Sequence, residues 1–471
     1  MPRPLRWYDY ITININWFAI TSRSNVLTPL VIPLLVQQFV GEEVKGTYLG
    51  KMRLWALMAA LLTQAITGLI SDHSRLKIGR RRPFILIGVA IEIISIILIG
   101  WSFHNKGMSG YWILFILYIL IMIGGNINHA ATQGFIPDLI PDDKKGIASG
   151  IKAVFEVPLP LIFVSVGVAT MVSAGNMSDA LTLLIVILLV CTALSMLVPE
   201  KQNLDSLPDF NWKPILRPAI MTGIFTIIIL GIGAVISRIL PLFRSLPSHL
   251  DLLLTGFIGV TGIALAVVIG IWGSLQIGLG KEIKKQKSYL WWVVNRLFFL
   301  VGVTNLGNFL IFFLQEKYQD FKLEQAVGPA SKIILIVGIF VLLTALFGGW
   351  LADRFGKKML IMVSGLATAI GTGIVVLVPN METAYSGGAI IGLGVGLFYT
   401  ANWALVTEIV PKERAGQFLG FSNLAGAGAG AIGAYIGGPI ADSSSFSLLM
   451  ALSGVLALLS ILALIGIKSK R

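Results

Sequence analysis

The sequence predicts an all-α polytopic membrane protein, and its composition, its long apolar stretches and the distribution of its charges support this fold class. Of the 471 residues, 56% are hydrophobic and only 13% are charged. Soluble domains are about one quarter charged and less than half apolar. A chain this apolar could not cover a water-exposed surface with polar side chains, so the composition excludes the soluble classes of protein.

Fourteen stretches are long and apolar enough to cross a bilayer as helices, which takes about 20 residues each. They lie near 11–36, 54–71, 84–103, 111–137, 147–171, 180–198, 218–240, 250–279, 291–314, 331–352, 359–379, 384–408, 418–438 and 445–467. Because lipid offers backbone groups no hydrogen-bond partner, these spans must be helical. The first stretch lacks a short apolar core followed by a small-residue cleavage site, so we interpret it as a retained helix.

The net charge of +13 follows the sidedness of a membrane protein. Lysine and arginine gather in alternate connections at 72–83, 281–287, 353–358 and 468–471, whereas 104–110, 173–179 and 379–383 carry few. Basic loops stay on the cytoplasmic side. We therefore expect both termini to be cytoplasmic in a plasma (inner) membrane, with attraction to anionic membrane lipids and no nucleic-acid partner. The single cysteine permits no intramolecular disulfide, and the four histidines show no metal-ligand spacing, so we expect no metal or cofactor.

Two loop motifs occur twice in the chain. GLISDHSRLKIGRRRPFILIG (68–88) matches GGWLADRFGKKMLIMVSG (348–365), and PDLIPDDKKGIASG (137–150) matches TEIVPKERAGQFLG (407–420) without a gap. Each copy joins the second span to the third, or the fourth to the fifth, of its half. The repeat predicts an N-terminal six-helix bundle (1–199), a linker with two inserted transmembrane helices (200–290) and a C-terminal six-helix bundle (291–471).

The duplicated loops resemble the signature of the major facilitator superfamily, which reads roughly G-x-x-x-D-R-x-G-R-[RK] between helices two and three. The longer copy, with GRRRPFI, resembles the glycoside–pentoside–hexuronide cation symporters and the sucrose-type proton symporters. The resemblance implies a monomeric transporter with two six-helix bundles. Fourteen spans depart from the usual twelve, and VFEVPLPLIF in the fifth span lacks the G-x-x-x-G-P pattern of drug–proton antiporters.

The repeated loops predict a cytoplasmic gate of weak ion pairs. Its residues are Asp72, Gly79, Arg80, Arg81 and Asp138 in the first half and Asp353, Arg354, Gly356, Lys357 and Glu408 in the second. The acids end helices, the bases precede the next helices, and the glycines permit tight turns. Such pairs contribute roughly 0–1 kcal/mol each, which suits a gate that opens in every cycle. A cluster that only sets topology would explain the bases but not the duplicated acids and glycines.

Charges within the spans are candidate functional residues, because each costs about 2.5–3.5 kcal/mol at mid-bilayer. Arg23 lies deep in the first span, where we expect it to face the central cavity and to contact an anionic solute group or a carboxylate partner. A structural bridge to a neighbouring helix is the alternative. Arg296 lies nearer the predicted cytoplasmic side, where it could reach water. Glu156 is the first candidate for proton or cation coupling, with Lys152 one turn before it as an alternative static partner. Glu92 is the second acid.

Polar and aromatic side chains mark the fourth span of each half. Asn126, His129 and Gln133 share a helical stripe, and Tyr399, Asn402 and Trp403 lie opposite His129, Thr132 and Gln133 in the gapless repeat. Both sets could line a cavity for a polar organic solute, although helix packing is the alternative for each. Pro158 and Pro160 should bend the fifth span beside Glu156.

Together these features predict a secondary transporter, not an enzyme, that moves a small polar organic solute, sugar-like or anionic, with H⁺ or Na⁺ as coupling ion. A drug or lipid exporter of the same superfamily is the alternative within the class, and a transport-dead receptor or scaffold is the alternative outside it. The glycine-rich stretches 392–398 and 426–438 lie inside spans with no preceding strand, so they indicate close helix packing and not a nucleotide site.

Overall fold

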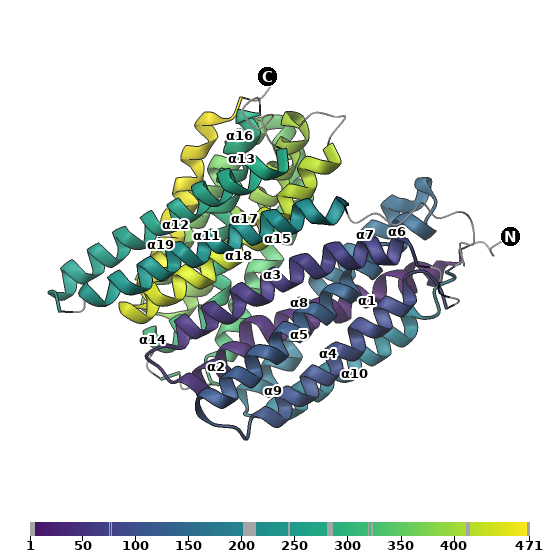
Figure 1. The fold of residues 1–471 in the computed structure, drawn as a ribbon, viewed down its shortest axis with the longest axis horizontal. Coiled ribbons are helices and arrows are strands. Elements are labelled where there is room, and N and C mark those ends of the chain that lie inside the picture. Colours follow the sequence, from purple (N-terminus) through teal and green to yellow (C-terminus); the bar gives the residue numbers. More distant parts are fainter. Residues whose placement is uncertain are drawn as a thin grey trace. The chain divides into compact units, whose positions relative to one another are not determined.

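The computed structural model describes residues 5–74, 76, 78–200, 213–243, 245–279, 286–318, 320–321, 324–410 and 415–468. In these ranges every regular element is a helix, and the prediction of an all-α polytopic protein is confirmed (Figure 1). Within the described residues, thirteen helices are long and apolar enough to cross a membrane. The predicted span near 418–438 is not among them and corresponds to the 29-residue helix α18 (Ala415–Ser443).

The chain forms two compact units. Unit 1 comprises residues 1–39 and 59–216, and unit 2 comprises 40–58 and 217–471. Helix α3 (Lys45–Asp72) is continuous and contributes its first half to unit 2 and its second half to unit 1. The predicted boundaries at 199 and 290 stay a prediction.

Unit 1 is built from helices that pack in neighbouring pairs, and Figure 1 shows α1, α4, α5 and α10 running alongside one another. Besides part of α3, its helices are α1 (Trp7–Val26), α2 (Ile32–Val40), α4 (Arg82–Ser102), α5 (Gly107–Gln133), α6 (Phe135–Leu139), α7 (Lys145–Glu156), α8 (Pro158–Ile162), α9 (Ala169–Ser173) and α10 (Met177–Ser195). π-helical turns at Leu27–Val31 and Phe163–Val168 continue α1 into α2 and α8 into α9.

The fifth span of unit 1 is interrupted where the prolines predict it. Helix α7 ends at Glu156, Val157 departs from helical geometry (φ −120°, ψ −73°), and α8 begins at Pro158. Since a proline removes one backbone donor and crowds the preceding turn, the interruption follows from the sequence. It places Glu156 at a helix end.

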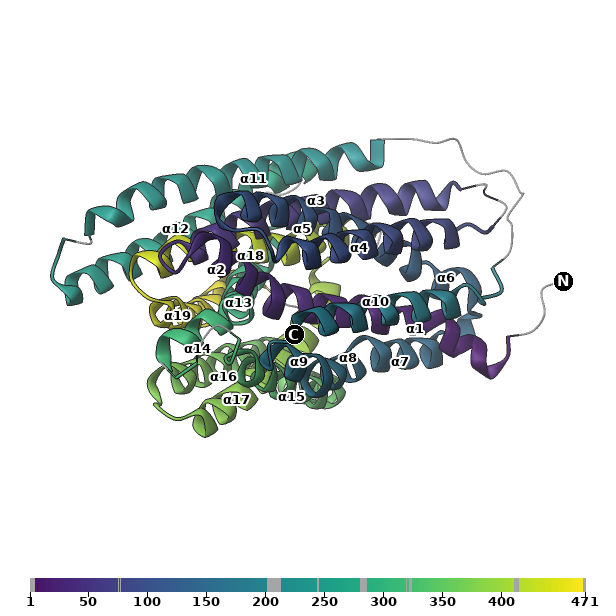
Figure 2. The same ribbon diagram turned by 90° about the horizontal axis from the view of Figure 1, so that it is seen from below.

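Unit 2 contains the inserted helices and the second repeat. Its helices are α11 (Lys213–Ile239), α12 (Ser248–Leu279), α13 (Lys287–Asn308), α14 (Leu310–Lys317), α15 (Val327–Phe355), α16 (Lys357–Leu377), α17 (Met381–Ile409), α18 and α19 (Phe446–Ala463). Figures 1 and 2 both show α11 and α12 side by side, and the side chain of Phe225 on α11 packs against Gly270 on α12. Residues 281–285 and 411–414, which fall in the predicted basic loop and the second repeat motif, lie outside the described residues.

Candidate functional site

An arginine and a glutamate form a buried ion pair inside unit 1. Arg23 on α1 lies 3.5 Å from Glu92 on α4, measured from Nη2 to Oε1, and the two residues are 4% and 0% exposed. Neither oxygen of Glu92 accepts a hydrogen bond from a described residue, and Arg23 Nε donates none. Most buried polar atoms in proteins are bonded, so these orphaned atoms mark a site where a ligand or a proton could act.

A glycine on a third helix makes room for this pair. A Cβ atom added to Gly125 on α5 would lie 2.7 Å from Glu92 Oε1 and closer still to Arg23 Nη2. Real Cβ atoms do not approach other heavy atoms this closely, so any larger residue would displace one partner. The sequence reasoning missed Gly125, because only the packing of α1, α4 and α5 reveals its role.

A second charged cluster in unit 1 surrounds Trp17. Lys152 Nζ lies 3.9 Å from the centroid of the Trp17 ring and 3.3 Å from Glu156 Oε2, which confirms the predicted pair one turn apart on α7. His129 also meets the Trp17 ring edge-on, with ring centroids 5.0 Å apart. Both charged side chains remain partly exposed, at 26% and 37%, so this pair is wetter than the Arg23–Glu92 pair.

The fourth span of unit 1 is tied to the first by a buried amide. Asn16 Nδ2 on α1 donates to Asn128 Oδ1 at 2.6 Å and to Thr132 Oγ1 at 2.7 Å. Of the predicted stripe, Asn126 bonds within its own helix to the Met122 carbonyl, His129 is half-buried and Gln133 is exposed. The structure therefore brings His129 to the Trp17 cluster but gives Asn126 and Gln133 no such partner.

Unit 2 contains a corresponding hydrogen bond between the first and fourth helices of its repeat. Asn295 Oδ1 on α13 accepts from Asn402 Nδ2 on α17 at 3.0 Å, and Asn295 Nδ2 donates to the Ser460 carbonyl on α19 at 2.8 Å. Trp292 Nε1 donates to the Asn402 carbonyl at 3.0 Å. Asn402 is fully buried among these partners, and its predicted place in a solute cavity stays a prediction.

Arg296 completes this second cluster. Its Nη1 donates to Asn402 Oδ1 at 2.9 Å, and its guanidinium carbon lies 5.5 Å from the Trp292 ring and 5.2 Å from the Trp403 ring. Arg296 forms no ion pair with any residue that the structure describes. Tyr399 and Trp403, one turn apart on α17, are 44% and 43% exposed.

The predicted gate residues of unit 1 assemble into an ion-pair network. Arg81 contacts Asp138 Oδ2 through Nε at 2.9 Å and Asp72 Oδ1 through Nη2 at 2.6 Å, and Arg80 contacts the same two acids. Gly79 makes the turn before them with φ +128°, where other residues are strained. The network joins the end of α3, the start of α4 and the end of the fourth span.

Glu200 contacts the same loop, and the sequence reasoning did not find it. Its carboxylate accepts from the backbone N–H groups of Arg81 at 2.6 Å and Arg82 at 3.3 Å, at the start of α4. A carboxylate at a helix N-terminus satisfies free donors and favours the helix dipole. Glu200 lies well beyond the loop in sequence, so no local pattern marks it.

The described residues of the corresponding part of unit 2 contain one ion pair. Lys357 at the start of α16 pairs with Glu408 at the end of α17, and Gly356 turns with φ +88°. Asp353 and Arg354 are exposed, and Arg354 packs over Trp350 and Phe355. Each described network lies within one unit, so the predicted latch between the two halves stays a prediction.

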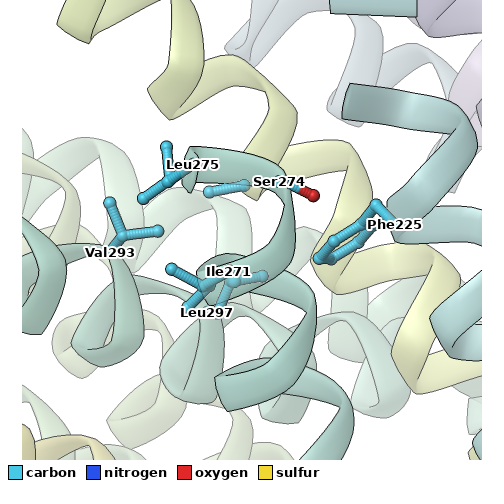
Figure 3. Close-up of a pocket in the computed structure, with 7 residues that line it drawn as sticks. Phe225, Ile271, Ser274, Leu275, Val293 and Leu297 are labelled. Atoms are coloured by element: carbon cyan, nitrogen blue, oxygen red, sulfur yellow. The ribbon is translucent and has the colours of Figure 1, made fainter. Parts of the chain in front are cut away.

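An apolar cavity of about 20 Å³ lies between the inserted helices and the second repeat of unit 2 (Figure 3). It is lined by Phe225, Ile271, Ser274, Leu275, Val293, Leu297 and Ala425. The single hydroxyl, on Ser274, donates to the Met221 carbonyl at 3.3 Å. A space of this size and lining suits neither a charged nor a polar solute.

Comparison with known sequences decides the family. The sequence model of the Major Facilitator Superfamily matches residues 15–315 and 293–470 of this chain. The chain belongs to this superfamily. It is therefore an integral multi-pass membrane protein, and no group of three or more potential metal ligands occurs in the part of the chain that the structure describes.

Individual relatives match only part of their length. The minor myo-inositol transporter IolF of Bacillus subtilis (strain 168) is 40% identical over 88 residues, 19% of this chain and 20% of that protein. The multidrug resistance protein MdtG of Serratia proteamaculans (strain 568) is 30% identical over 149 residues, 31% of this chain and 36% of that protein. These matches cover much less than two thirds of either relative.

Solved structures match over nearly the whole chain. The nucleoside transporter NupG has a TM-score of 0.67 at 11% identity and covers 97% of this chain and 99% of its own. The D-xylose–proton symporter has a TM-score of 0.64 at 14% identity and covers 98% and 99%. At these identities the likeness shows the fold alone.

Proposed function

We propose that the protein is a secondary active transporter that moves a small polar organic solute by alternating access, with a proton as the coupling ion. The observation that carries the proposal is the buried Arg23–Glu92 pair, in which neither carboxylate oxygen accepts a hydrogen bond from a residue that the structure describes. The printed names of the similar proteins, among them a myo-inositol transporter and a D-xylose–proton symporter, support transport of polar solutes.

The pair has the properties of a two-state charge switch. With Glu92 ionised, the two charges offset each other in a region where an isolated charge is costly. With Glu92 protonated, Arg23 keeps its charge and gains a requirement for another anion or for water. Proton binding and solute binding can therefore bias the same element, which is the thermodynamic content of coupling.

Glu156 is the second coupling candidate. Its exposure and its contact with Lys152 make protonation less consequential, since water and a lysine already solvate it. In this proposal the Asp72–Arg81–Asp138 network and the Lys357–Glu408 pair belong to a gate on the cytoplasmic side, where both termini also lie, in a plasma membrane. Na⁺ coupling is the alternative to H⁺.

Proton-coupled flux tests the proposal directly. The purified chain is reconstituted in liposomes that contain a pH-sensitive dye, and sugars, nucleosides and organic acids are added one at a time. We expect at least one solute to move protons. Glu92→Gln should abolish solute-driven proton movement while solute exchange at equal concentrations persists, and Glu156→Gln should have a smaller effect.

The matched control is Glu382→Gln, an exposed acid in the first turn of α17 that should leave flux unchanged. Undiminished proton movement in Glu92→Gln would contradict the coupling assignment. Efflux of a cationic dye such as ethidium, with no flux of any polar solute, would favour a drug exporter. No flux of any kind from correctly inserted protein would favour a receptor or scaffold.

A further inference from the structure

We propose that the Arg296 cluster of unit 2 binds the carboxylate of an organic anion whose flat ring packs against Trp403 and Tyr399. The inference rests on the proposed function, because it names the class of solute that the transporter carries. It chooses the anionic solute over a neutral sugar. Three features support it: an uncompensated charge, an open aromatic face and a rigid scaffold.

The charge of Arg296 has no counter-ion among the described residues. Among the residues that the structure describes, it donates one hydrogen bond, to the neutral acceptor Asn402 Oδ1, and its buried Nε has no partner. The amide nitrogen of Asn402 is already engaged by Asn295. A half-buried guanidinium in a membrane span therefore keeps its full charge and spare donors, which only an anion can satisfy together.

The cluster has one closed side and one open side. Trp292 is fully buried and its Nε1 is held by the Asn402 carbonyl, so this side of the guanidinium is covered. Trp403 lies over the guanidinium yet is 43% exposed, and Tyr399 is 44% exposed one helical turn away. A ligand reaching Arg296 from the open side must pass along these two aromatic rings.

The chemistry of these groups selects a carboxylate attached to a ring. A guanidinium presents a planar fork of donors that matches the two oxygens of a carboxylate. Exposed aromatic rings prefer to stack on or meet edge-on another flat ring. A neutral sugar could hydrogen-bond to Arg296 but would leave its charge uncompensated, so the carboxylate fits this site better.

The scaffold holds the cluster in place without a ligand. Asn295 bonds both Asn402 and the Ser460 carbonyl, and Phe299 stacks on Phe398 with ring centroids 3.7 Å apart and planes 7° apart. These contacts fix α13 against α17 on both sides of Arg296. A preformed site loses less side-chain freedom on binding.

Equilibrium binding to the full chain in phosphatidylcholine nanodiscs tests the inference. The probes are benzoate, its neutral isostere benzamide, and dihexanoyl phosphatidylglycerol as a source of lipid phosphate, and the readouts are calorimetry and tryptophan fluorescence. We expect benzoate to bind at least about tenfold more tightly than benzamide and the lipid. Arg296→Gln should abolish benzoate binding, Arg296→Lys should weaken it about tenfold because the fork is lost, and Trp403→Ala should weaken it further than Trp403→Phe.

The matched control is Arg238→Gln, an exposed arginine in the last turn of α11 that should leave benzoate binding unchanged. Arg296→Lys keeps the charge, so its retained thermal unfolding separates lost binding from lost folding. Equal binding of benzoate and benzamide, or benzoate binding that survives Arg296→Gln, would overturn the inference. Binding of the lipid but not benzoate would also overturn it and assign a headgroup site.

The outcomes separate this inference from the proposed function. Sugar-driven proton flux without benzoate binding would refute the anion site and leave transport standing. Benzoate binding without flux of any solute would support the site and refute transport.

Discussion

The two units each contain an arginine within a membrane span, but the surroundings of its charge differ. In unit 1, Arg23 faces Glu92 at 3.5 Å and both are almost fully buried. In unit 2, Arg296 faces an amide and two tryptophan rings, and no described carboxylate pairs with it. Unit 1 is therefore self-compensated when its acid is ionised, whereas the Arg296 cluster contains no compensating carboxylate among the described residues.

A similar hydrogen bond joins the first and fourth helices in both units, so the difference is specific to the arginine and its neighbours. Asn16 ties the first helix to Thr132 on the fourth, and Asn295 ties the corresponding helices through Asn402, the repeat counterpart of Thr132. The residue after each asparagine then diverges: it is Trp17 in unit 1 and Arg296 in unit 2. The hydrogen-bonded asparagine is thus followed by an aromatic residue in one unit and by a cationic residue in the other.

Removing one charge from each unit should give the largest difference in the free energy of unfolding between the units. Glu92→Ala leaves Arg23 buried without a counter-ion, and we expect it to lower the free energy of unfolding by about 3–5 kcal/mol. Arg296→Met removes a charge that has no counter-ion among the described residues, so it should change stability little or increase it. Unfolding by steric trapping in bicelles measures both, and an equal cost for the two variants would show that Arg296 is compensated.

Crowding the ion pair should have the next largest effect. Gly125→Ala forces Arg23 and Glu92 apart, and we expect a loss of about 1–3 kcal/mol in unfolding free energy, as for overpacked cores. Gly100→Ala on α4 is the matched control, since its added methyl group would meet only Leu181 at an ordinary 3.9 Å. Equal stability of the two variants would mean that the pair tolerates separation.

Variants in the predicted gate networks of the two units should show the smallest difference in stability. Arg81 is 7% exposed and donates to Asp138, Asp72 and Ser71, so Arg81→Ala should cost about 1.5–3 kcal/mol. Lys357 makes one pair with Glu408, whose side chain is 40% exposed, so Lys357→Ala should cost about 0–1 kcal/mol. Thermal unfolding of the reconstituted variants ranks them, and a larger loss for Lys357→Ala would contradict the ordering.

Features that depend on neighbouring residues could be predicted from the sequence. The spans, the helix interruption before Pro158, the Lys152–Glu156 pair and the turn glycines Gly79 and Gly356 all follow from patterns within a few residues. The repeat also identified Asp138 and Glu408 as partners of the basic loops, because a duplicated motif reports a shared contact.

Features that depend on packing between distant helices could not be predicted. The sequence marked Arg23 and Glu92 as costly charges, but their pairing requires α1, α4 and the gap at Gly125 to meet. Glu200 looks like an ordinary acid at the end of a span until the fold brings it to the start of α4. The hydrogen bonds of the Asn402 amide with Asn295 and Arg296 likewise require α13 and α17 to meet.

The division of α3 between the units has a consequence for how the polypeptide assembles. Its first half packs on α18, where Asp442 accepts the backbone N–H groups of Gly46 and Thr47 at 2.8 and 2.6 Å, and Gly50 lies against the Ala434 backbone. The first half of α3 therefore gains these contacts only after α18, near the end of the chain, has been synthesised. A fragment that ends before α11 would expose the face of α3 that contains Gly46 and Gly50, because α18, which covers it, would be missing. The N-terminal segment is therefore an incomplete folding unit during translation.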